Sequence, residues 1–151
     1  MENQDKKFPF PQANDFNKVI KLLNTNEEQL TNKKILQEVI DVSTERQVQY
    51  YISACQFLGL IDENCKFTNV ALKIRQSCFD NKIISLSRLI VSTPVFGEVF
   101  FKKYIYNEDS SKDEIAQLIS DLWESGDGFA VCYRRAGTVK KWLEWIEKNG
   151  E

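Results

Sequence analysis

The chain has 151 residues, of which 42% are hydrophobic, enough for one packed domain or two small ones that share a core. No apolar run is long enough to cross a bilayer, and the N-terminus lacks a signal-peptide core, so the sequence predicts a cytoplasmic protein without a membrane partner. Lysine and arginine number 20 against 22 acidic residues, and this balance argues against a protein that coats nucleic acid non-specifically.

Basic residues are nevertheless concentrated in two segments that contain no acidic residue. Segment 64–79 holds three of them and segment 128–143 holds four, whereas acidic residues collect at 108–127. A local patch of this kind suits a protein that binds nucleic acid specifically. The basic residues in question are Lys66, Lys73, Arg75, Arg134, Arg135, Lys140 and Lys141.

The N-terminal part of the chain predicts a tail followed by three helices. Residues 1–14 form the tail, and Phe8 or Phe10 is expected to dock on the body. Apolar residues at helical spacing predict helices over 15–24, over 32–39 and from Ser43 or Thr44 to Leu58. Thr44 and Gln47 have the spacing of a capping box, and Gly59 is a suitable helix stop.

A small hairpin and a further helix are expected next. Residues 60–61 and 65–68 predict short strands around a turn at 62–64, and residues 69–76 predict a helix. Three helices followed by a hairpin are typical of a winged helix-turn-helix, in which the third helix reads DNA. The outward positions of that helix are Arg46, Gln47, Gln49, Tyr50 and Ser53, although such polar residues equally suit a face that is merely solvated.

The second half repeats this plan loosely. Helices are predicted over 81–91, from Thr93-Pro94 to Tyr104, and over 113–123, the last capped by Ser110 or Ser111 with Glu114 in capping-box range of Ser111. A turn at 126–128 and an alternating strand at 129–133 follow. The predicted fold is therefore mainly α with small β-hairpins, a tandem winged helix-turn-helix with units at 15–79 and 80–151.

The last helix is expected to begin at Thr138 as its N-cap, after an Ala136-Gly137 hinge. Its apolar face has helical spacing, and positive charge gathers at its start, as in a helix that meets phosphate or enters a DNA groove. An ordinary amphipathic helix with a solvated basic edge is the alternative. The apolar face consists of Val139, Trp142, Leu143 and Ile146, and the charges come from Arg134, Arg135, Lys140 and Lys141.

Residues suited to catalysis or metal binding are scarce. The chain has no histidine, and its four cysteines lack Cys-x-x-Cys spacing, so we expect neither a zinc site nor a histidine-activated nucleophile. No phosphate-binding loop and no strand-borne acid pair of the metal-dependent nucleases occurs. We expect no enzyme, no cofactor and no metal, and we interpret the cysteines as buried reduced thiols.

Three patterns, at residues 51–61, 66–69 and 134–146, resemble the tandem winged-helix DNA-recognition regions of restriction-modification proteins, particularly type IIS restriction endonucleases. The resemblance implies sequence-specific binding of double-stranded DNA. Those endonucleases also carry a nuclease domain, for which this chain is too short, so the resemblance implies either a recognition module of a larger protein, with a nuclease domain or subunit as its partner, or a stand-alone relative. The DNA-binding residues would be Arg46, Gln47, Gln49, Tyr50, Arg134, Arg135, Thr138, Lys140 and Lys141.

A second hypothesis is a protein–protein adaptor or dimerising winged-helix protein that does not bind DNA. An aromatic segment would supply its partner surface. The residues concerned are Phe96, Phe100, Phe101 and Tyr104.

Overall fold

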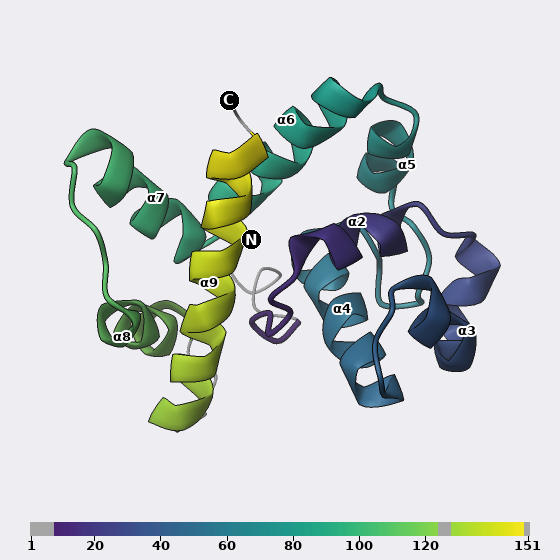
Figure 1. Cartoon of the computed structure of the whole chain (residues 1–151), viewed down its shortest axis with the longest axis horizontal. Coiled ribbons are helices and arrows are strands. Elements are labelled where there is room, and N and C mark those ends of the chain that lie inside the picture. Colours follow the sequence, from purple (N-terminus) through teal and green to yellow (C-terminus); the bar gives the residue numbers. More distant parts are fainter. Residues whose placement is uncertain (1–7, 124–127, 150–151) are drawn as a thin grey trace.

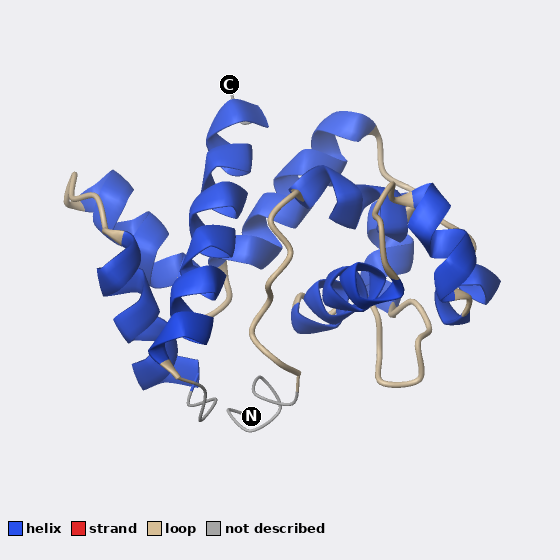
Figure 2. Cartoon of the chain, turned by 60° about the horizontal axis from the view of Figure 1, so that its bottom comes forward, coloured by secondary structure: helices blue, strands red, loops and turns tan. Residues whose placement is uncertain are grey.

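The computed structural model describes residues 8–123 and 128–149, and within them the protein is built from α-helices (Figures 1 and 2). Helices α2 to α5 form an N-terminal half, α7 to α9 lie on the other side, and α6 runs between them (Figure 1). The elements are α2 (Phe16–Leu23), η1 (a 3₁₀ turn, Glu27–Thr31), α3 (Lys33–Val39), α4 (Glu45–Phe57), α5 (Asn69–Arg75), α6 (Phe79–Val91), α7 (Phe96–Ile105), α8 (Lys112–Trp123) and α9 (Phe129–Asn149).

Helices of the N-terminal half begin at the capping residues that the sequence indicates. The Asp15 side chain accepts a hydrogen bond from the Asn17 backbone at the start of α2, and the predicted capping box of Thr44 and Gln47 is present at the start of α4. Gly59 adopts a φ of 79° just after α4, which a residue with a Cβ rarely does. Local capping therefore fixes these boundaries, and the three predicted helices are confirmed.

The predicted wings are wrong. In the described chain the segment after α4 pairs through a single antiparallel bridge, Ile61 to Phe67, and forms no strand. The Asp62 carboxylate accepts from the backbone of Asn64 and Lys66 at 2.8 and 3.0 Å, which closes a tight turn. The chain then enters α5 at once, since Thr68 caps that helix. This antiparallel contact is too short to form a wing, so the tandem winged helix-turn-helix does not form within the described residues.

The strand predicted over 129–133 is also wrong, because these residues form the first turns of α9. Cys132, Ala136 and Val139 are all buried, at helical spacing, so the inward face of α9 begins well before Thr138. Thr138 is not an N-cap: it is fully buried inside the helix and donates to Asn14 Oδ1 at 2.7 Å.

Helix α7 begins later than the Thr93-Pro94 start that the sequence indicates. Its N-cap is Val95, which is fully buried and has a φ of 70°. The first turn of α8 agrees better with prediction, since Ser111 and Glu114 exchange the two hydrogen bonds of a capping box.

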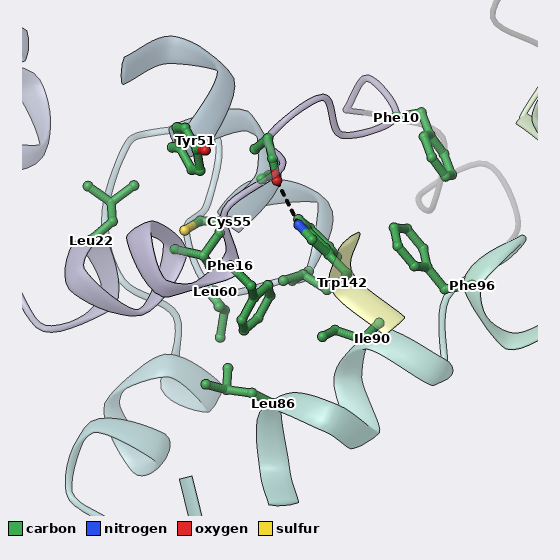
Figure 3. Close-up of a cluster of buried hydrophobic side chains, with 14 of the residues drawn as sticks. Phe10, Phe16, Leu22, Tyr51, Cys55, Leu60, Leu86, Ile90, Phe96 and Trp142 are labelled. Atoms are coloured by element: carbon green, nitrogen blue, oxygen red, sulfur yellow. Dashed lines mark hydrogen bonds between the residues drawn. The ribbon is translucent and has the colours of Figure 1, made fainter. Parts of the chain in front are cut away.

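Residues 8–15, here called the N-terminal segment, lie between the two halves. Phe10 is 2% exposed, and its ring stacks on Phe96 at 5.5 Å and meets Phe57 edge-on at 5.3 Å. The expected docking of Phe10 is thus confirmed. The Ala13 carbonyl accepts from the Trp142 indole at 2.7 Å (Figure 3). One hydrophobic core consequently spans both predicted units.

Candidate nucleic-acid interface

Helix α3, the connection 40–44 and helix α4 form a helix–turn–helix whose turn is bonded to α2. The Lys18 ammonium donates to the backbone carbonyls of Ile40 and Asp41 at 3.0 and 2.5 Å. The Gln37 amide donates to the Ser43 carbonyl at 3.0 Å. These bonds fix the direction in which α4 leaves the turn, so its outward face is preorganised.

That outward face carries paired polar side chains one turn apart. Arg46 Nε donates to the Tyr50 hydroxyl at 3.0 Å, with the guanidinium carbon 5.7 Å from the ring centre. Gln49 donates to the Ser53 hydroxyl at 3.1 Å. The opposite face of α4 is buried, so the Arg46–Tyr50 pair stands on a rigid support. A guanidinium held by a tyrosine suits a base edge or a phosphate.

Gln47, although exposed, is engaged at the start of α4. Its side-chain oxygen accepts from the Ser43 and Thr44 backbone at 2.8 and 3.3 Å. A bidentate contact with adenine needs the oxygen as well as the amide nitrogen, so this bond would have to break first. Of the predicted α4 residues, Arg46, Gln49 and Tyr50 are therefore better placed to read DNA than Gln47.

The basic cluster on α9 is divided by the helix. Arg134 and Lys141 are exposed and lie seven residues apart, so they share one face, and Lys148 continues it two turns further. Arg135 is half-buried on another side of the helix. Lys140 is half-buried and borders a cavity of about 80 Å³ between α7, α8 and α9. The exposed face of Arg134, Lys141 and Lys148 is called here the α9 stripe.

A shallow groove of about 370 Å³ runs beside the α9 stripe, and Lys141 and Lys148 line it. Asp15 and Glu144 line the same groove, so its charge is mixed rather than uniformly positive. Phosphate contacts by the α9 stripe would thus depend on individual ammonium and guanidinium groups, and not on a strong positive electrostatic potential over the whole groove.

Both candidate helices start on the same side of the molecule. In Figure 1, α4 and α9 each begin at the lower edge, and the N-terminal segment lies between them. Helix α8, which carries exposed Asp113, Glu114 and Asp121, packs on the side of α9 that faces away from α4. Acidic side chains of α8 therefore do not separate the α4 surface from the α9 stripe.

Within the described residues no group of three or more histidine, cysteine, aspartate or glutamate side chains is arranged to hold a metal ion. Burial raises the pKa of the Cys55 thiol to about 12, and Cys132 is likewise buried, whereas Cys78 is exposed. No single described helix is long and apolar enough to span a membrane, and only the pair α6 and α7, bent by 103°, meets that requirement together.

A family model described as a domain of unknown function, DUF7226, matches residues 18–150 of the chain. The chain belongs to the DUF7226 family. The match runs from α2 to the end of α9, so it includes both candidate helices and the core between them. No curated protein and no solved structure matches the chain.

Two contacts that position the site were missed from the sequence. Lys18 was not distinguished from other surface lysines, because its acceptors lie over twenty residues away in the chain. The Trp145 indole donates to Asn17 at 3.2 Å, which joins α2 to α9. For Cys132, Ala136 and Val139, by contrast, the spacing i, i+4, i+7 was a local signal for a longer α9.

Proposed function

We propose that this DUF7226 protein is a sequence-specific double-stranded DNA-binding module whose reading element is α4. The observation that carries the proposal is the Arg46–Tyr50 pair, which lies on the outward face of a helix whose turn is clamped by Lys18. In helix–turn–helix proteins the second helix enters the major groove, and a side chain held in place loses less entropy on contact.

The α9 stripe would contribute phosphate contacts from the neighbouring side. Arg134 and Lys141 are about 10 Å apart along the helix axis, given a rise of 1.5 Å per residue. Phosphate contacts set position and register and base contacts set sequence, so the two helices would have different roles. The interior position of Thr138 and the cavity position of Lys140 leave both outside this proposed interface.

The resemblance to restriction-modification proteins gives the proposal its cellular setting. We infer that the module serves as the recognition part beside a nuclease domain or subunit and acts in the cytoplasm. The absence of wings from the described residues means that such recognition would rely on helices.

The direct test is selection of bound sequences from a random duplex library, followed by a titration of affinity against salt. We expect enrichment of one sequence class. Arg46→Ala should relax the preference at one or two base pairs, at a cost of about 1–3 kcal/mol in binding. Failure to enrich any sequence, together with undetectable binding at low salt, would remove the proposal.

The role of the α9 stripe is tested separately with Arg134→Ala combined with Lys141→Ala. Affinity should fall for every duplex alike, and the slope of log affinity against log salt should decrease by about 1.8, since each phosphate contact contributes about 0.9. Lys140→Ala is the matched control, because that side chain borders the cavity between α7, α8 and α9 and not the stripe. An equal effect of both changes would place the phosphate contacts elsewhere.

A further inference from the structure

An apolar groove lies between α6, the middle of α7 and the C-terminal part of α9. Its volume is about 520 Å³. Two large apolar side chains of α6 remain open to solvent at the groove, Phe79 at 68% and Ile84 at 50% exposure. Exposed side chains of this size beside a groove indicate a surface that a partner covers. The lining residues used below are Asp80, Ile84, Ser87 and Arg88, all on α6.

The groove holds one charge of each sign at symmetric positions. Asp80 and Arg88 both line it, and each lies four residues from Ile84, on opposite sides. Positions four apart along a helix form one ridge of its surface, so the three side chains make a row of acid, apolar and base. Neither charge forms an ion pair among the described residues.

We propose that a second copy of this chain covers the groove, with the two α6 helices antiparallel about a twofold axis at Ile84. In such an interface a contact from residue i to residue j is repeated from j to i, so Asp80 faces Arg88 of the other copy and the reverse pair forms at the same time. The two Ile84 side chains meet on the axis, and Ser87 is small enough to let the helices approach. The row of Asp80, Ile84 and Arg88 is therefore complementary in charge to an antiparallel copy of itself. A surface that binds an unrelated partner has no need of this property.

The proposed dimer leaves the α4 part of the candidate DNA surface uncovered. In Figure 1, α6 lies in the upper part of the molecule, whereas α4 and α9 begin at the lower edge. Dimerisation through α6 and DNA binding through α4 consequently use different parts of the protein. Either proposal can fail without the other.

The test is a charge exchange followed by sedimentation velocity on the full chain. Wild type should be a reversible dimer at micromolar concentration. Asp80→Lys and Arg88→Glu should each weaken dimerisation by about tenfold or more, since each places like charges opposite one another twice. Glu38→Lys, an exposed charge reversal on α3, is the matched control and should have no effect.

The decisive measurement mixes the two single variants. In the mixed dimer the Asp80→Lys change on one copy meets the Arg88→Glu change on the other, and the unchanged Arg88 of the first copy meets the unchanged Asp80 of the second. Opposite charges then face each other at both places, so a heterodimer should form where neither variant dimerises alone. The double variant Asp80→Lys with Arg88→Glu should likewise recover self-association.

Circular dichroism checks that all of these variants fold. A monomeric wild type, or a dimer indifferent to both single changes, overturns the proposal and leaves the groove for a different protein or a small ligand.

Discussion

Helices α4 and α9 both present arginine to solvent, yet they are built in different ways. The boundaries of α4 are set within the helix and its own turn, through the Thr44 cap and the Gly59 stop. The position of the middle of α9 is fixed by distant residues, because Thr138 and Trp142 donate hydrogen bonds to Asn14 and Ala13. The α4 surface can therefore be altered without loss of the fold, whereas the α9 stripe depends on a core helix.

The largest expected effect comes from cutting into the shared core. Trp142→Ala removes a fully buried indole that packs on Phe16 and Phe96 and should lower the free energy of unfolding by about 3–5 kcal/mol. Urea unfolding followed by circular dichroism measures the change. Phe129→Ala is the control on the same helix, since that ring is 57% exposed and its removal should cost less than about 0.5 kcal/mol. Equal effects would mean that α9 is not the core helix.

A smaller effect is expected from the α4 cap. Thr44→Ala removes the acceptor for the Gln47 backbone N–H, which lies at 3.1 Å, and should cost about 1 kcal/mol in the same unfolding measurement. Thr44→Ser retains a hydroxyl and should cost little. If Thr44→Ala were as harmful as Trp142→Ala, the expectation that the α4 surface can be altered without loss of the fold would be wrong.

Gly137→Ala should stabilise the protein by about 0.5–1 kcal/mol, because glycine inside a helix carries an entropic cost that alanine does not. A Cβ built there would lie 3.7 Å from the Lys112 ammonium, an ordinary contact with a flexible side chain. The measurement is the urea midpoint at constant slope. Destabilisation would instead mean that the added methyl group disturbs the packing of α9 around Lys112.

The smallest effect concerns pH. Hydrogen bonds from Lys103 and Tyr104 hold the pKa of Glu147 below its usual range. A carboxyl whose pKa is lower in the folded state stabilises above its unfolded pKa, and this contribution is lost as pH falls through the folded pKa. Glu147→Gln should therefore lower Tm by about 1–3 °C at neutral pH, and by less below about pH 4. Glu38→Gln, on an exposed face of α3, should show no such pH-dependent difference.

Local sequence patterns predicted most of the helices but not the long-range contacts that join them. The pairs Thr44 with Gln47 and Ser111 with Glu114 lie three residues apart, so the sequence itself holds both partners of each capping box. Thr138 also has capping chemistry, but its partner is Asn14, 124 residues away, and no local pattern reports such a contact. Residues 129–133 alternate as a strand would when taken alone, but Cys132 continues the helical spacing of Ala136 and Val139, and these residues form the start of α9.

The candidate site was predicted as a set of residue types rather than as a surface. Arg46, Gln49 and Tyr50 were expected on the outward face of the third helix, and they lie there because Val48, Tyr51 and Ile52 on the other face are buried. The α9 cluster was expected to act together, but a continuous helix turns Arg134 and Lys140 to different sides. Adjacent charges in a sequence share a surface only when the helical phase allows it.

The hydrogen bond between Ala13 and the Trp142 indole closes a loop across nearly the whole chain. Closing a loop of that length is entropically unfavourable, so this contact belongs among the last to form during folding. Until α9 exists, the aromatic ring of Phe16 lacks its neighbours Trp142 and Trp145, so a nascent chain would leave it exposed. The nascent chain is thus most prone to aggregation late in its synthesis, just before α9 is complete.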